Sequence, residues 1–205
     1  MDRRAFTLVE ILVCLAILAV LYGLILPTTA SIVEATGRHQ TRVRFRQWIL
    51  AMEEFRAEYG YLPDVASGSG LVDTGKMLAA LTGCDTLGQP VADADLQGNF
   101  RRIRFRDFAD GELLRLLSGP IDAELVDGQD NSQIGILIDR DGDGVIWGDE
   151  IRVVPVAAGN SRDGFSATLS PPDSVVGPMT VIAGRVAFYS AGSGANADRF
   201  VYSWR

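Results

Sequence analysis

The sequence predicts an α+β fold, in which one long N-terminal helix begins as a transmembrane segment and is followed by a mostly antiparallel sheet. Three observations lead to this prediction. The chain opens with an apolar stretch from Phe6 to Leu26, and apolar side chains then recur at helical spacing between residues 45 and 59. From residue 123 onward, short β-branched runs alternate with turns rich in glycine, serine and proline.

The opening stretch is long enough to cross a membrane. Its 21 residues carry a single charge, at Glu10, and Pro27 follows them directly. At 1.5 Å of rise per residue, such a helix spans about 32 Å, enough for a hydrocarbon core. A carboxylate inside such a span costs a few kcal/mol unless it has a partner, so Glu10 is a candidate functional residue.

Two simpler interpretations account for less of this N-terminus. A cleaved signal peptide has an apolar core of about 7–15 residues, which is shorter than the stretch found here. A plain signal anchor explains the length and the basic residues Arg3 and Arg4, but it leaves Glu10 unexplained. The two arginines favour a cytoplasmic N-terminus by the positive-inside rule, although four more arginines follow between residues 38 and 46.

Residues 5–10, with the sequence AFTLVE, resemble the processing site of type IV prepilins and type II secretion pseudopilins. The resemblance covers the first 27 residues and implies that a prepilin peptidase cuts between Ala5 and Phe6 and methylates the new amine. It also implies that Glu10 pairs with the amine of Phe6 on a neighbouring subunit, which sets the register of a filament. The family usually has glycine before the cut; because Ala5 is also small, we expect cleavage to be retained.

This resemblance implies a pilin-like organisation in four parts. Residues 1–5 are a prepilin leader, residues 6–27 a transmembrane and polymerisation helix, residues 28–60 the periplasmic half of the helix, and residues 61–205 a globular head. The aromatic stripe on the third part is predicted to pack against a sheet, and it consists of Phe45, Trp48, Met52, Phe55 and Tyr59. Gly60 and Pro63 are predicted to end the helix.

The head is predicted to contain short helices first and strands later. Residues 76–81 predict a helix capped by Asp73 or Thr74, and residues 110–117 predict a second short helix. Residues 99–105 alternate apolar and basic side chains, as an extended segment does. Strands are predicted at residues 134–138, 151–156, 179–183, 185–190 and 200–204, with a loop over residues 157–178.

An acidic loop between the predicted strands 134–138 and 151–156 is the candidate metal site. Counted from Asp139, carboxylates occupy positions 1, 3 and 5, glycine occupies position 6 and glutamate position 12, which is the spacing of an EF-hand loop. The flanking runs are β-branched, so we predict a strand–loop–strand calcium site instead of an EF-hand. The predicted ligands are Asp139, Asp141, Asp143, the backbone carbonyl of Val145, Glu150, and Asp198 from a second loop at residues 190–198. The alternative is a polar Asx turn that binds no metal.

Net charge, catalytic motifs and cysteine positions narrow the range of functions. The net charge of −7 argues against nucleic acid as the main partner, because phosphate binding requires a basic surface. The only histidine is His39, and the sequence contains no zinc-protease, phosphate-loop or serine-hydrolase motif, so we predict no enzymatic activity. Cys14 and Cys84 fall in different environments, and no disulfide is predicted between them.

The predicted function is a structural filament subunit of a type IV pilus-like or type II secretion pseudopilus, stabilised by Ca²⁺. Its predicted partners are prepilin peptidase, the bacterial inner membrane, and other copies or other pilin-like subunits in a filament. The precursor is expected to cross the inner membrane once, with a cytoplasmic N-terminus and a periplasmic head, before it enters a periplasmic or surface filament. The alternative function is a signal-anchored periplasmic calcium-binding protein that does not polymerise.

Overall fold

The computed structural model describes two compact units, residues 1–37 and residues 38–205. The described residues are 8–115, 123–148, 151, 153–162, 164–176, 180–192 and 200–204, with the backbone alone at 23–31, 115, 166 and 173. The fold is a mixture of helix and antiparallel sheet, which confirms the predicted α+β class.

Helix α1 runs Leu8–Tyr59 and accounts for all of the regular structure described in the first unit. Of the predicted membrane span, residues 6 and 7 lie outside the described residues, as do the side chains of residues 23–26. The described side chains from Leu8 to Tyr22 are all exposed. Over the described part of the chain, no helix combines the length and the apolar character needed to cross a membrane.

In the second unit, α1 contributes the aromatic stripe that its sequence predicts. Phe45, Trp48, Met52 and Phe55 are fully buried. The rings of Phe45 and Trp48 lie 5.7 and 5.5 Å from the ring of Phe188, and this spacing is typical of packed aromatic pairs. The helix ends at Tyr59, followed by Gly60 in the left-handed region at φ +84°, so the predicted stop is confirmed.

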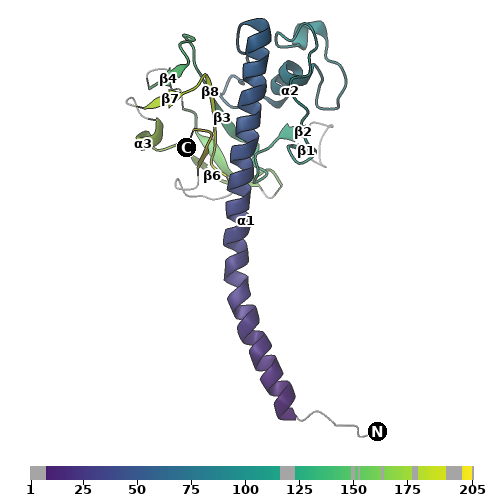
Figure 1. Cartoon of the computed structure of the whole chain (residues 1–205), viewed down its shortest axis with the longest axis vertical. Coiled ribbons are helices and arrows are strands. Elements are labelled where there is room, and N and C mark those ends of the chain that lie inside the picture. Colours follow the sequence, from purple (N-terminus) through teal and green to yellow (C-terminus); the bar gives the residue numbers. More distant parts are fainter. Residues whose placement is uncertain are drawn as a thin grey trace. The chain divides into compact units, whose positions relative to one another are not determined.

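A three-stranded antiparallel sheet lies at the centre of the second unit (Figure 1). Its strands, in spatial order, are β3 (Ile134–Ile138), β8 (Val186–Ser190) and β9 (Val201–Tyr202). Ile136 and Phe188 belong to the core cluster that contains α1, whereas Leu137 and Tyr189 belong to a second cluster on the opposite face. The sheet is therefore covered on both faces, and β3 forms one of its two edges.

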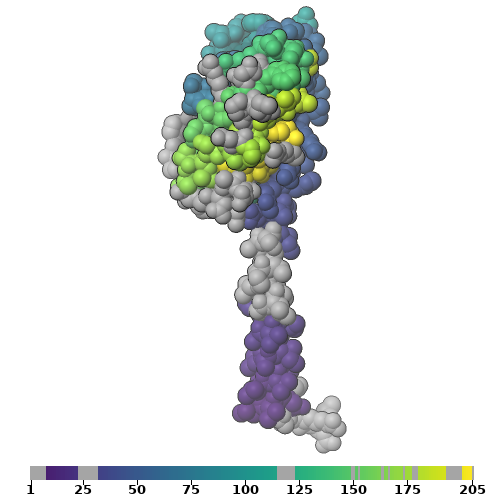
Figure 2. All heavy atoms as spheres, turned by 90° about the vertical axis from the view of Figure 1, so that its left-hand side faces the viewer, coloured from purple at the N-terminus to yellow at the C-terminus, as the bar shows by residue number. Residues whose placement is uncertain are grey.

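Shorter elements surround this sheet. They are α2 (Thr74–Thr82), the 3-10 helix η1 (Asp93–Asp95), α3 (Asp173–Val176), and the antiparallel pairs β1 (Leu113–Arg115) with β2 (Ala123–Leu125), β4 (Val145–Trp147) with β7 (Val181–Ala183), and β5 (Val156–Asn160) with β6 (Gly164–Leu169). Residues from the second half of the chain, green to yellow in Figure 2, lie in the middle of the face of the second unit shown there. The predicted cap of α2 is confirmed, because Asp73 accepts a hydrogen bond from the backbone N–H of Lys76.

Three sequence predictions about the head are wrong. The predicted helix at 110–117 contains β1, because Leu113 pairs with Leu125, which is buried. The predicted loop at 157–178 contains most of the β5–β6 hairpin and α3, since long-range pairing and the burial of small side chains outweigh the local glycine content. The predicted strand at 151–156 is irregular over residues 153–155, and β4 instead begins at Val145, inside the predicted metal loop.

Candidate functional site

The acidic loop, residues 139–144, joins β3 to β4 and is held at both ends by the turn between β7 and β8. The backbone N–H of Asp139 donates to the carbonyl of Arg185 at 2.8 Å, and the N–H of Gly184 donates to the carbonyl of Gly144 at 3.0 Å. Gly142 and Gly144 both have positive φ, at +81° and +93°, which allows the chain to turn sharply here. Hydrogen bonds therefore fix both ends of the loop, and its two glycines define the turn between them.

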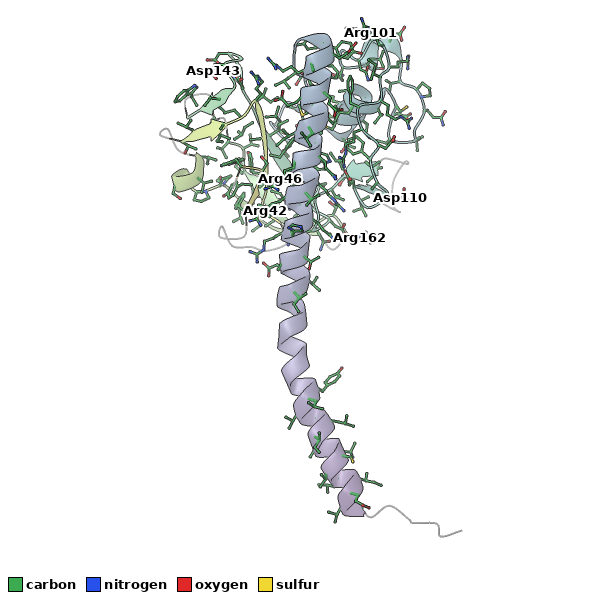
Figure 3. The ribbon with its side chains drawn as sticks, in the orientation of Figure 1. Arg42, Arg46, Arg101, Asp110, Asp143 and Arg162 are labelled. Carbon is green, nitrogen blue, oxygen red and sulfur yellow. The ribbon has the colours of Figure 1, made fainter. Side chains whose placement is uncertain are left out.

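The three aspartates converge inside this loop. One carboxylate oxygen from each of Asp139, Asp141 and Asp143 lies within 4.8 Å of the other two. Asp139 is buried, with 6% of its surface exposed, whereas Asp141 and Asp143 are exposed. Figure 3 labels Asp143 beside β4. The sequence spacing correctly predicts that the three carboxylates come together.

Backbone N–H groups hold these carboxylates in place. Asp139 accepts from Gly142 at 2.7 Å through Oδ1 and from Gly144 at 2.8 Å through Oδ2. Asp141 accepts from the N–H of Asp143 at 3.0 Å, and Asp143 accepts from the N–H of Val145 at 2.7 Å. The bonds of Asp141 and Asp143, each from the N–H two residues further on, are those of consecutive Asx turns, so the geometry also agrees with the predicted alternative of a polar turn.

Asp139 is held in its ionised form. Burial acts to raise its pKa, but the N–H groups of Gly144 and Gly142, the contact with Asp141 and the charge of Arg185 together lower the pKa below its ordinary value. Arg185 lies beside the loop, because a Cβ added to Gly144 would sit 3.3 Å from its Nη2. Arg185 thus places a positive charge beside the three converging carboxylates, in addition to Arg140 within the loop itself.

The donor set fits a hard divalent cation. Calcium takes six to eight oxygen ligands in flexible geometry, and carboxylate oxygens are the ligands it prefers. Asp139, Asp141 and Asp143 would supply side-chain oxygens from one face of a short turn, and Val145 follows them as the first residue of β4. Glu150 and Asp198, the other predicted ligands, lie outside the described residues.

The described start of the second predicted loop lies away from the aspartates. Ser190 pairs with Ile134, at the end of β3 opposite to Asp139. Its hydroxyl donates to the buried carboxylate of Asp127 at 2.7 Å, and the carbonyl of Gly192 accepts from the side chain of Asn131 at 3.0 Å. Residues 190–192 therefore support the turn at Asp127 instead of the acidic loop.

Sequence reasoning missed two contributors to the acidic loop. The indole N–H of Trp147 donates to Asp143 at 2.9 Å, and 43% of the surface of Trp147 is exposed. Trp147 lies within the 12 positions counted from Asp139, and this place in the sequence was the available sign that its side chain contacts the loop. Arg185 comes from a distant turn, so no local pattern in the sequence indicates it.

Residues 1–26 match the family model of the prokaryotic N-terminal methylation motif. This motif is characteristic of type IV prepilin-like and pseudopilin-like proteins. The chain carries a prepilin-type N-terminus. No curated protein and no solved structure matches the chain.

The prepilin-type N-terminus includes the predicted processing residues and the predicted assembly residue. Ala5 and Phe6 lie inside the matched range but outside the described residues. Glu10 lies in the first turn of α1 and is exposed. Such N-termini are typical of membrane-anchored pilins, indicate processing by prepilin peptidase, and belong to proteins that are structural rather than catalytic.

Proposed function

We propose that this chain is a structural filament subunit of a type IV pilus-like or type II secretion pseudopilus. The observation that carries the proposal is the N-terminal methylation motif at residues 1–26. Prepilin peptidase cuts between Ala5 and Phe6 on the cytoplasmic side and methylates the amine of Phe6. The helix that follows, through residue 27, anchors the subunit in the bacterial inner membrane before assembly, with the head in the periplasm.

The distribution of burial along α1 supports this proposal. The described side chains from Leu8 to Tyr22 are exposed and mainly apolar, so they are suited to a surrounding of lipid or of neighbouring helices. The buried stripe from Phe45 to Phe55 belongs instead to the core of the second unit. Each half of the helix therefore has its own task, polymerisation for the first and folding of the head for the second.

Glu10 directs assembly in this proposal. Its carboxylate pairs with the methylated amine of Phe6 on a neighbouring subunit, either a second copy or another pilin-like protein. When one partner of an ion pair in an apolar surrounding is removed, the charge that remains is left unpaired, and this is strongly unfavourable. Register along the filament then follows from this pair, while the apolar surface of α1 supplies packing.

The acidic loop binds Ca²⁺ and stabilises the head in the same proposal. The side chains of Asp139, Asp141 and Asp143 supply oxygens, and the carbonyl of Val145, Glu150 and Asp198 complete the ligand set. The convergence of three carboxylates within 4.8 Å supports this step. Because the loop joins β3 to β4 and is tied to the β7–β8 turn, a bound cation holds four strand ends together.

The filament proposal is tested first by the intact mass of the full chain after expression with and without a prepilin peptidase. We expect a product that begins at Phe6 and carries one additional methyl group, formed only with the peptidase. The matched control is Ala5→Gly, which restores the usual family residue and is expected to be processed at least as completely. An uncut chain for both forms would refute the proposal and favour a signal-anchored periplasmic calcium-binding protein.

The calcium step has its own test, in which terbium(III) replaces Ca²⁺ and Trp147 sensitises its emission. Trp147 is suited to this role because its indole N–H contacts Asp143 directly. We expect saturable emission that Ca²⁺ displaces, that Trp147→Phe strongly reduces, and that Asp141→Asn weakens. Emission that is absent, or that Asp141→Asn leaves unchanged, would show that the loop is a polar turn only.

A further inference from the structure

The exposed side of α1 in the second unit changes its charge along one row of side chains. Residues four apart on a helix are neighbours, and each step of four turns by about 40° around the helix axis. Arg42, Arg46, Leu50 and Glu54 form such a row, and all four are exposed. The row therefore begins with two cations on one side of the helix and ends with a carboxylate on the other.

Arg42 and Arg46 lie on a side of α1 that the fold leaves uncovered, and together they are called the arginine flank. Phe45, Trp48 and Phe55 of the same helix are fully buried in the core of the second unit, on a different face. The side chains of the two arginines make no hydrogen bond or ion pair with another described residue. Figure 3 shows both arginines on the left of α1. Two unpaired positive charges therefore lie next to each other here.

The other side of α1 carries an excess of carboxylates. Residues 101–106 contain four arginines, but each of them has an acidic partner within the head. The pairs are Arg101–Glu58, Arg102–Asp93, Arg104–Asp107 and Arg106–Glu112. Glu54 and Asp110 are exposed, and neither has an ion-pair partner among the described residues. These two residues are called the carboxylate flank, and the charge left over on this side is negative.

Asp110 lies along α1 at the level of the two arginines. Residues on either side of it line a pocket together with side chains of the helix, namely Ala109 and Glu112 with His39, Gln40, Val43, Arg44 and Gln47. In Figure 3 Asp110 lies on the right of α1, whereas Arg42 and Arg46 lie on the left. The two flanks therefore border the same exposed face of the helix from opposite sides.

A second copy of this chain matches both flanks at once. An anionic lipid surface suits the arginines but leaves the carboxylates without a partner, and the net charge of −7 disfavours a nucleic acid. When like flanks of two copies meet, equal charges repel, whereas unlike flanks are electrostatically complementary. A contact between unlike flanks is heterologous, and heterologous contacts generate rings or open helical filaments.

We infer that the arginine flank of one copy, Arg42 and Arg46, docks on the carboxylate flank of the next copy, Glu54 and Asp110. Leu50 lies between the flanks with 62% of its surface exposed, so apolar contact accompanies the ion pairs. Exposed ion pairs add little affinity individually, so their role is to select which sides of two copies meet. The contact rests on the proposed function, because it joins neighbouring subunits of the filament.

The test measures self-association of the full chain in lipid vesicles, by energy transfer between copies labelled at the C-terminus with a donor or an acceptor. The variants are Arg42→Glu/Arg46→Glu on one flank and Glu54→Arg/Asp110→Arg on the other. We expect each variant alone to need about tenfold more protein per vesicle for half-maximal transfer, because attractions become repulsions. A mixture of the two variants should recover the wild-type behaviour, since every contact between them again joins opposite charges.

The matched control is Arg104→Glu/Arg140→Glu, which changes the net charge by the same amount as the arginine-flank variant. Both replaced side chains are exposed and lie outside the arginine flank. We expect this control to retain the wild-type energy transfer. Loss of transfer in the control equal to that in the arginine-flank variant would show that net charge alone governs association, and would refute the inference.

Three further outcomes would overturn the inference. The first is wild-type energy transfer no greater than that of either flank variant. The second is loss of transfer in both variants that their mixture does not recover, which would place the effect within each chain. The third is transfer that requires phosphatidylglycerol in the vesicles and that Glu54→Arg/Asp110→Arg leaves unchanged, which would identify an anionic lipid surface as the partner of the arginines.

Failure of the filament proposal is recognised separately, by an uncut chain in the mass measurement. Processing at Phe6 together with energy transfer that ignores both flank variants would refute the docking of the two flanks alone.

Discussion

Replacing Gly135 with alanine should be among the most destabilising single changes in the head. Gly135 lies in β3 directly under the ring of Tyr189, which is fully buried. A Cβ at this position would lie 2.0, 2.4 and 2.5 Å from three atoms of that ring, far inside ordinary contact distance. The ring must therefore move. Because the core around it is close-packed, this movement also displaces neighbouring side chains and costs free energy.

The cost follows from what the Tyr189 ring holds in place. Its hydroxyl accepts from the N–H of Val154 at 2.9 Å and donates to the carbonyl of Val154 at 3.0 Å. Overpacking a core costs about 1–3 kcal/mol, and each lost hydrogen bond about 0.5–1.5 kcal/mol. Together, the free energy of unfolding should fall by about 2–6 kcal/mol, out of the 5–15 kcal/mol typical of a domain.

The assay is urea unfolding of the full chain in detergent, followed by tryptophan fluorescence and circular dichroism. Gly68→Ala is the matched control, because a Cβ there meets nothing within 4 Å and its φ is not positive. In a Tyr189→Leu background, Gly135→Ala should cost much less, since the clashing ring is gone. A loss below about 1 kcal/mol for Gly135→Ala in the wild-type background would refute the packing of Tyr189 over Gly135, because overpacking alone costs at least that much.

Three further predictions concern charged groups of the head. Glu112→Ala should lower the free energy of unfolding by about 3–5 kcal/mol, because it leaves the largely buried side chain of Arg106, only 12% exposed, without its ion partner at 2.6 Å. Glu112→Gln should cost less in the same urea assay. Burial raises the pKa of Asp127 above its ordinary 3.8, despite hydrogen bonds that act to lower it, so the folded state binds the proton more tightly than the unfolded state. This stabilisation is complete below about pH 3.8 and is lost as the pH rises through the raised pKa, so the free energy of unfolding of Asp127→Asn should increase relative to that of wild type as the pH rises above 3.8. A difference between the two proteins that does not change with pH would contradict this. Asp141→Ala should lower the thermal midpoint in Ca²⁺ and remove its response to chelator, whereas a wild-type midpoint that ignores chelator would show that the loop is only a turn.

Local physics accounts for the parts of the fold that the sequence predicts correctly. The aromatic stripe of α1 follows from side chains at spacings of three and four, and the α2 cap follows from Asp73. The convergence of Asp139 with its two neighbours is also local, because alternate residues around Gly142 turn toward one point. None of these predictions requires knowledge of a distant contact.

Long-range contacts explain the errors. The β-branched run at 151–156 predicts a strand, yet both backbone groups of Val154 are satisfied by the hydroxyl of Tyr189, so no strand partner is needed. Residues 157–160 are small and locally resemble a loop, but pairing with β6 makes them a strand, with a bulge at Gly159. Arg185 reaches the acidic loop from the β7–β8 turn, and its sequence position carries no sign of this.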